Sequence, residues 1–237
     1  MIANYTENGW EIIAQRSHGL LAGQLCARWK TSQRGKRWVE TLVASADHDD
    51  VFNEFERGPL IGESGGPLDF SMNSFDQIAS QKLIDMAMAK GSFIALLISR
   101  HIAFTHGKEA AAQDFLKSLT AKKSEWLTSS GSSEEELAAA YEILEFCDAL
   151  SLIICKDGIP PEGRKLEISS GPDGSMYTVN LKQDRMVIMP WPFSEKSFEV
   201  SYERRIIPEL TFKDDDVLRT LLRDTLADRK VIILSQR

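Results

Sequence analysis

The chain has 237 residues, of which 43% are hydrophobic and 27% charged, and its net charge at pH 7 is −7. This length and composition predict a globular protein that can bury a substantial core. The acidic balance argues against a protein that tracks along nucleic acid, because that kind of binding needs a basic surface that displaces counterions. We therefore expect no nucleic-acid partner.

The sequence also argues against a membrane or secreted protein. No stretch reaches the ~18 apolar residues of a membrane-spanning helix, and the first ten residues lack the pattern of a signal peptide. Cys26, Cys147 and Cys155 lie among apolar neighbours without Cys-x-x-Cys spacing, as expected of buried thiols in a reducing compartment. We expect a cytoplasmic protein.

The N-terminal residues predict a β-hairpin. Asn8-Gly9 is a favoured pair for a tight turn, so residues 2–6 can pair with residues 10–14. A lone hairpin is marginally stable in water, and we expect it to join a sheet formed further along the chain.

Helical periodicity dominates residues 16–157. The Gly- and Pro-containing segment 51–73 interrupts it and predicts an irregular loop, long enough to suit a lid or pocket wall. Ser17 is the expected cap of the first helix, and Ser133 with Glu136 forms a capping box for the last. The predicted helices span residues 17–29, 36–48, 74–90, 93–101, 108–127 and 133–156.

The C-terminal part of the sequence predicts several short strands and one helix. The predicted helix spans residues 214–227 and is capped by Asp214. We expect a mainly α protein of one domain, 1–237, in which a helical bundle over 16–157 carries a small antiparallel sheet from residues 1–15 and 158–237. The predicted strands are residues 166–169, 177–182, 186–189, 198–206 and 231–234.

Asp148 is the most informative single residue. It falls in an apolar stripe of its predicted helix, and a buried, unpaired carboxylate costs several kcal/mol. It must be protonated, hydrogen-bonded, paired with an arginine, placed at a helix cap, or bound to a cation. The other members of the stripe are Leu137, Tyr141, Leu144, Leu152 and Cys155.

The only four histidines lie in the first half of the chain, near predicted helix ends. His18 heads an apolar stripe, and His48 precedes Asp49 where a helix ends. Taken singly, each is more often a satisfied core residue than a ligand. Together with Asp148 they supply the nitrogen and oxygen ligands of a Zn, Fe, Mn or Mg site with one or two ions.

The order of these residues resembles that of the HD-domain superfamily of metal-dependent phosphohydrolases. The matching segments are Ser17–Ala22, Ala44–Asp49 and Cys147–Leu152. The resemblance implies an HD-like helical bundle in which His18, His48, Asp49 and Asp148 hold the principal metal and Asp49 can bridge to a second ion. It also implies that His101 and His106 bind that second ion or the phosphoryl oxygens of the substrate.

One departure concerns the lysine that often follows the His-Asp pair in that superfamily. This chain has Asp50-Val51-Phe52-Asn53 there, so Arg100 would supply the positive charge instead. The whole chain is also similar to a bacterial family catalogued only as a domain of unknown function. That similarity rests on Glu7–Ile13, His48–Asp50, Pro67–Phe70, Ser99–His101 and Trp191–Phe193.

We thus predict a metal-dependent hydrolase of a phosphate ester or nucleotide, with Asp49, His101 and Arg100 as catalytic residues and a small phosphorylated molecule as substrate. Glu54 or Glu56 would line the pocket mouth or be solvated loop acids. A homodimer is compatible with the apolar C-terminal strands. The alternatives are a di-iron HD-like oxygenase and a non-catalytic, metal-stabilised binding protein.

Overall fold

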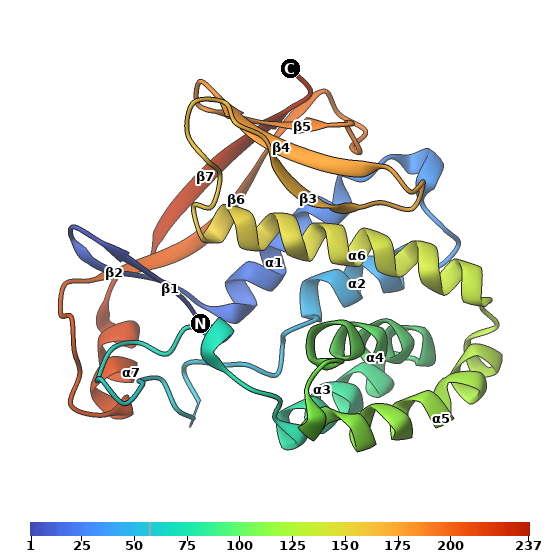
Figure 1. The fold of residues 1–237 in the computed structure, drawn as a ribbon, viewed down its shortest axis with the longest axis horizontal. Helices are drawn as coiled ribbons and strands as arrows, with labels where there is room; N and C mark the ends of the chain where they lie inside the picture. The colour runs from blue at the N-terminus through green and yellow to red at the C-terminus, as the bar shows by residue number, and fades with distance from the viewer. Residues whose placement is uncertain (57) are drawn as a thin grey trace.

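A curled sheet packs over a layer of helices in the computed structural model, which describes residues 1–56 and 58–237 (Figure 1). The described residues form seven α-helices and seven strands. The helices are α1 (Gln15–Ala27), α2 (Trp38–Asp47), α3 (Gln77–Lys90), α4 (Ser92–His106), α5 (Gln113–Ser130), α6 (Glu134–Cys155) and α7 (Asp215–Asp224). The strands are β1 (Ile2–Thr6), β2 (Gly9–Ile13), β3 (Leu166–Ser170), β4 (Met176–Lys182), β5 (Arg185–Met189), β6 (Ser197–Ile207) and β7 (Asp228–Ser235).

All seven strands belong to one mixed sheet of order β1-β2-β6-β7-β5-β4-β3. Strand β6 is long enough to pair with β7 along most of its length and with β2 near its end. It thereby joins the N-terminal hairpin to the C-terminal strands, as expected. Strands β5 and β7 run parallel, while the other neighbours run antiparallel. The predicted mainly α fold with a small antiparallel sheet is wrong: the fold is α+β with an extensive mixed sheet.

The hairpin turn lies one residue earlier than predicted. Thr6 pairs with Gly9, so Glu7 and Asn8 form the turn and Gly9 opens β2. Gly9 has φ +107°, and a side chain there would collide with the carbonyl oxygen of Ile207 in β6. The glycine is therefore needed for its backbone conformation and for the close approach of β6, not for the turn itself.

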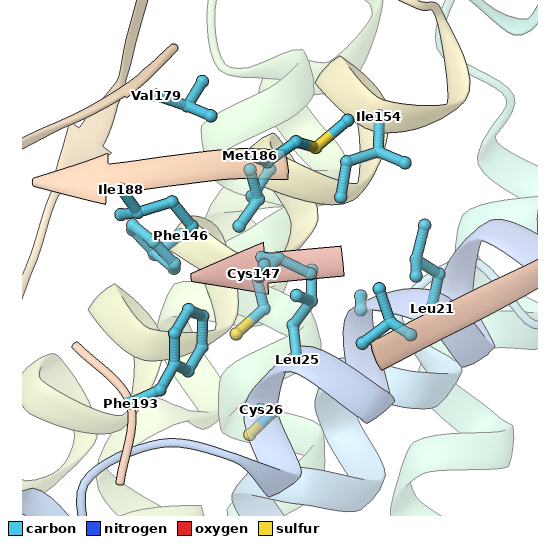
Figure 2. Packing of buried hydrophobic residues seen from close by; sticks show 14 of the residues in the cluster. Leu21, Leu25, Cys26, Phe146, Cys147, Ile154, Val179, Met186, Ile188 and Phe193 are labelled. Carbon is cyan, nitrogen blue, oxygen red and sulfur yellow. The ribbon is translucent and has the colours of Figure 1, made fainter. Parts of the chain in front are cut away.

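Helix α6 lies between the sheet on one side and helices α2 and α4 on the other, and buries two faces (Figure 1). Towards the sheet, Phe146 packs edge-on against Phe193, Tyr177 of β4 and Trp29, which lies just after α1, with ring centroids 5.0–6.3 Å apart. Figure 2 shows Phe146 and Phe193 within this buried apolar cluster. Burial of such large rings is a strong source of stability. Towards α4, the same helix presents Leu137, Tyr141 and Leu144.

The predicted capping signals were partly right. Ser133 and Glu136 form the capping box of α6, and the Asp214 carboxylate accepts a hydrogen bond from the Val217 amide at the start of α7. Helix α1, however, begins at Gln15, and Ser17 instead exchanges hydrogen bonds with the backbone of Glu203 in β6. Ser17 thus ties α1 to the sheet.

Helix α4 continues to His106, five residues beyond the predicted end. Among its described residues, segment 51–73 contains no α-helix or strand, only a 3₁₀ turn at Phe70–Met72 and an isolated bridge between Ile61 and Pro67. The three cysteines are free and buried, as predicted. No helix in the described part of the chain combines the length and apolarity needed to cross a membrane.

Candidate metal centre

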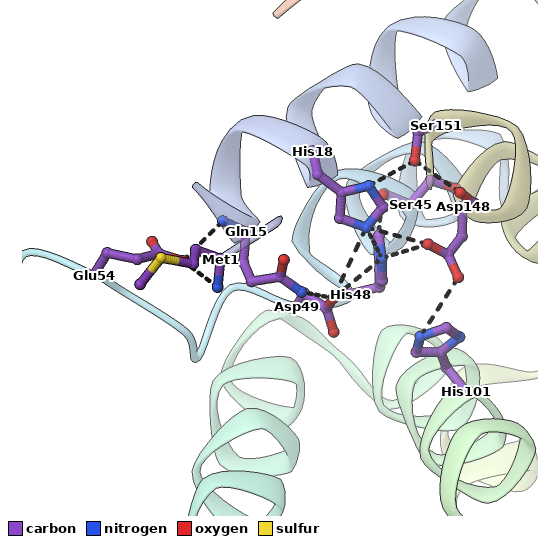
Figure 3. A network of polar contacts seen from close by, with 10 residues as sticks. All are labelled: Met1, Gln15, His18, Ser45, His48, Asp49, Glu54, His101, Asp148 and Ser151. Atoms are coloured by element: carbon purple, nitrogen blue, oxygen red, sulfur yellow. Dashed lines mark hydrogen bonds and ion pairs between the residues drawn. The ribbon is translucent and has the colours of Figure 1, made fainter. Parts of the chain in front are cut away.

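Four helices bring histidine and aspartate side chains to one point (Figure 3). His18 lies in the first turn of α1, His48 caps the C-terminus of α2, His101 lies in α4 and Asp148 in α6. Asp49 follows His48 directly, and because the helix has ended, both side chains can turn towards the same point. The expected difficulty of adjacent residues sharing a target is avoided in this way.

Glycines allow α1 and α2 to approach closely enough for this convergence. A Cβ atom at Gly19 would lie 2.5 Å from the carbonyl oxygen of Ala46, and one at Gly23 would lie 2.9 Å from the Ala46 side chain. Gly19 immediately follows His18, and Ala46 lies two residues before His48. The absence of side chains at these glycines therefore positions the two imidazoles.

At the centre of the cluster, four atoms lie close to one another: Nε2 of His18, Nε2 of His48, and one carboxylate oxygen each from Asp49 and Asp148. The Nε2 atoms of His18 and His48 are 3.1 Å apart. Asp148 Oδ1 lies 3.2 Å from the first and 3.1 Å from the second. Asp49 Oδ2 lies 3.8 and 3.7 Å from the same two nitrogens.

These separations match the ligand shell of a small cation. With metal–ligand bonds of about 2.0–2.2 Å, neighbouring ligand atoms stand roughly 3 to 3.6 Å apart in octahedral or tetrahedral geometry. The three distances among His18, His48 and Asp148 are 3.1–3.2 Å and fall in this range, whereas the two distances to Asp49 are slightly longer, at 3.7 and 3.8 Å. Ligand atoms of His18, His48 and Asp49 form one compact group, and those of His48, His101 and Asp148 form another, all within 4.8 Å of one another in each group.

Hydrogen bonds behind the histidines set their tautomers. Nδ1 of His48 lies 2.9 Å from the carbonyl oxygen of Ser45, which can only accept, so this nitrogen donates its proton. The Ser151 hydroxyl donates to the carbonyl of Asp148 and is therefore free to accept from Nδ1 of His18 at 2.7 Å. In their neutral forms both rings then present Nε2 lone pairs to the centre, as metal-binding histidines do.

The carboxylate of Asp49 is held in place by Gln15. The Gln15 amide donates to Asp49 Oδ2 at 2.9 Å, and its backbone N–H donates to Glu54 Oε1 at 3.0 Å. Glu54 is buried and also lies 2.9 Å from the nitrogen of Met1, so it does not line a pocket mouth. Glu56 is exposed and lies 3.8 Å from Lys82, as a solvated loop acid would.

The electrostatics of the cluster follow from burial and mutual attraction. Burial lowers the pKa of His48, but the charges of Asp148 and Asp49 outweigh it and raise this pKa to about 10. Burial raises the pKa of Asp148, yet His48 and the hydrogen bonds from His18 and His48 hold it well below its usual range. Burial and the charge of His48 lower the pKa of His101 to about 4. The carboxylate of Asp148 is therefore ionised at pH 7, and His101 is neutral.

His101 sits at the margin of the cluster. Its Nε2 lies 4.0 Å from Asp148 Oδ2, the oxygen turned away from the other two histidines, and its ring packs edge-on against His48. Among the described residues, its buried Nδ1 has no hydrogen-bond partner. Arg100, the next residue back, does not pair with the carboxylates; its guanidinium lies 4.9 Å above the ring of Tyr141.

His106 belongs to neither group of candidate ligands. Its Nδ1 lies 2.6 Å from Glu109 Oε1, and its ring packs against Phe75. Five helical residues after His101 correspond to a rotation of about 140° around α4, so the two side chains point in different directions. The structure does not support the expectation that His106 is a ligand.

The hydrogen-bonding roles of three neighbours of the cluster were not predicted from the sequence: those of Gln15, Ser45 and Ser151. Ser151 follows Asp148 by three residues, a spacing that places both on one helix face and was available as a signal. Ser45 contributes through its backbone carbonyl, which carries no signal of residue type. Gln15 at a helix start is too ordinary to stand out.

The chain belongs to the family described as Protein of unknown function (DUF3891), whose profile matches residues 1–209. This agrees with the resemblance to a family of unknown function. Searches of curated proteins and of solved structures gave no significant match. None of the comparisons links the chain to the HD superfamily.

Proposed function

We propose that this protein is a metal-dependent hydrolase of a phosphate ester or nucleotide, in which His18, His48, Asp49 and Asp148 hold a divalent cation. The observation that carries the proposal is the convergence of two imidazole nitrogens and a carboxylate oxygen within 3.1–3.2 Å of one another. Both imidazoles have their other nitrogen engaged, so the three atoms that face one another are acceptors when the rings are neutral.

Asp148 supports a cation rather than a purely structural role. Within the described residues its ion-pair partners are three histidines, and no arginine or lysine lies within pairing distance. A metal would balance its charge without requiring a proton on His48. Imidazole and carboxylate ligands suit zinc, iron and manganese better than magnesium.

Access favours a catalytic role for the centre. The side chains of Asp49 and Asp148 are 21% and 12% exposed, whereas those of His18 and His48 are at most 1% exposed. The cluster thus meets solvent on its carboxylate side. A bound divalent ion would supply a water of lowered pKa and polarise a phosphoryl oxygen. Asp49 would orient that water, while His101 and Arg100 would lie beside the phosphoryl group.

The strongest competing function is a non-catalytic protein stabilised by its metal. The burial of His18, His48 and His101 favours it, since all three are at most 4% exposed. A di-iron oxygenase is the other candidate, supported by the two groups of candidate ligands, which share His48. The three functions differ in metal identity and in reaction.

Elemental analysis of protein expressed with supplemented Zn, Mn or Fe tests the proposal. We expect about one or two equivalents of metal in the parent, and loss of most of it in His48→Ala and Asp148→Ala. His106→Ala is the matched control, because it removes a histidine that lies outside the cluster, and it should keep the metal.

Activity on p-nitrophenyl phosphate and on nucleotides, measured with and without chelator, separates the candidate functions. Metal-dependent phosphate release that is lost in Asp148→Ala supports the hydrolase. Bound metal without any turnover would favour the binding protein, and two irons with an oxygen-sensitive absorbance band would favour the oxygenase. A parent without stoichiometric metal would overturn the proposal.

A further inference from the structure

The hydroxyl of Tyr141 is an unexplained polar group close to the metal ligands. Tyr141 lies on α6 two turns before Asp148, is 5% exposed, and its hydroxyl has no hydrogen-bond partner among the described residues. A buried donor left unsatisfied is destabilising, because it has lost its hydrogen bonds to water without replacement. The ring of Tyr141 lies 6.4 Å, centroid to centroid, from that of His101, whose Nδ1 is also unpartnered, so two residues with such atoms are neighbours.

Positive charge lies next to these two groups. The guanidinium of Arg100 stacks 4.9 Å from the Tyr141 ring centroid, and within the described part of the chain it forms no ion pair. Its hydrogen-bonding N–H groups remain available for a ligand, because cation–π contact uses only the face of the guanidinium. Arg100 is half-buried, so the group reaches the surface of the molecule between α4 and α6.

We propose that Tyr141, Arg100 and His101 form a subsite for a single phosphate group beside the metal ligands. The inference rests on the proposed function and extends it, since it assigns Tyr141 and specifies a terminal phosphate as the group recognised. All three side chains can donate hydrogen bonds, and a phosphate offers several acceptor oxygens. His101 connects the subsite to the metal ligands through its 4.0 Å approach to Asp148.

The negative charge of Glu145 lies near the proposed subsite and should repel a phosphate. Its removal therefore tests whether the subsite binds an anion. Glu145 lies on α6 between Tyr141 and Asp148, and it interacts electrostatically with the Tyr141 hydroxyl. Removing its charge should therefore strengthen phosphate binding. If the subsite held a cation or only a water, removal of the Glu145 charge would weaken phosphate binding or leave it unaltered.

The experiment is calorimetric titration of the metal-loaded protein with inorganic phosphate, with metal content measured on every sample. We expect Tyr141→Phe and Arg100→Gln to weaken phosphate binding by about tenfold each, the loss of one good hydrogen bond to an ion. Glu145→Gln should tighten it by a few-fold. Metal content should equal that of the parent in all three variants.

Tyr202→Phe is the matched control. Tyr202 of β6 is also buried, and its hydroxyl has no partner among the described residues, but its charged neighbours, which include Glu11, Arg204 and Lys230, lie outside the cluster. Its phosphate affinity should equal that of the parent. No phosphate binding in the parent, unchanged binding in Tyr141→Phe, weakened or unchanged binding in Glu145→Gln, or loss of metal in Tyr141→Phe would each overturn the subsite. The metal content of the parent tests the proposed function separately.

Discussion

The two buried faces of α6 solve the problem of burial in different ways. The face towards the sheet is apolar, with Phe146 inside a group of aromatic rings from the segment after α1, from β4 and from the segment before β6. The face towards α2 and α4 buries Asp148 among three imidazoles. Burial of the apolar face stabilises the fold by removing hydrophobic surface from water. Burial of the polar face costs desolvation energy, which a bound cation or shared protons must offset.

This difference teaches where stability and function reside in the molecule. The apolar face should contribute the same stability whether or not metal is present. The polar face should contribute fully only when its ligand is bound. Substitutions on the two faces of one helix therefore separate the two contributions.

The largest expected effect is on the apolar face. Phe146→Ala should lower the free energy of unfolding by about 3–5 kcal/mol, because it opens a cavity in a close-packed aromatic group. Denaturant unfolding with and without chelator measures it, and the loss should be equal in both. A loss confined to the metal-loaded protein would contradict the independence of the two faces.

The next effect is that of metal removal. Metal bound only by the folded state stabilises it by roughly 2.7 kcal/mol when free metal is 100 times Kd. Chelation should therefore lower the stability of the parent and of Phe146→Ala alike, but leave Asp148→Asn unchanged. If chelator destabilised Asp148→Asn as much as the parent, Asp148 would not be a ligand.

A third prediction concerns the close approach of α1 and α2. Gly19→Ala places a methyl group 2.5 Å from the carbonyl oxygen of Ala46 and should cost about 1–3 kcal/mol of stability. It should also weaken metal binding, because His18 and His48 move apart. Gly35→Ala is the control, since a methyl group there meets nothing within 4 Å. Equal metal affinity in both variants would contradict the positioning role.

The smallest effect is expected from Ser151→Ala. The substitution removes the hydroxyl that accepts a hydrogen bond from Nδ1 of His18, but it leaves all the proposed metal ligands unchanged. Loss of such a partner typically weakens metal binding 10–100-fold. We expect the lower end of that range by calorimetric metal titration. Ser118→Ala on α5 is the control, because its hydroxyl bonds only to the carbonyl of Phe115 three residues earlier, as Ser151 bonds to that of Asp148. An affinity for metal that is unchanged in Ser151→Ala would contradict the role of this hydroxyl.

Local patterns in the sequence predicted the elements better than their assembly. The apolar stripe of α6 correctly marked Asp148 as buried, and the capping box of Ser133 with Glu136 marked the start of that helix. The extent of the sheet was missed because the pairings of β6 depend on tertiary packing. Strand β2 lies at the other end of the sequence from β6, and helix α7 separates β6 from β7. The parallel pairing of β5 with β7 has no local signal at all.

The candidate site shows the same limit. His18, His48, Asp49 and Asp148 were selected by residue type and position, and the structure brings them together. His106 was selected as a histidine between the His-Asp pair and the final aspartate, but the phase of α4 turns it towards Glu109. Tyr141 was recognised only as part of an apolar stripe, because nothing in the sequence shows that its hydroxyl lacks a partner.

The most direct test is a crystal structure of metal-supplemented protein with diffraction data collected on both sides of the metal absorption edge. We expect an anomalous peak about 2.0–2.3 Å from Nε2 of His18 and of His48, with an oxygen of Asp148 in the same shell. A structure without an anomalous peak there, in which protons shared between the imidazoles and the carboxylate hold the cluster together, would contradict it.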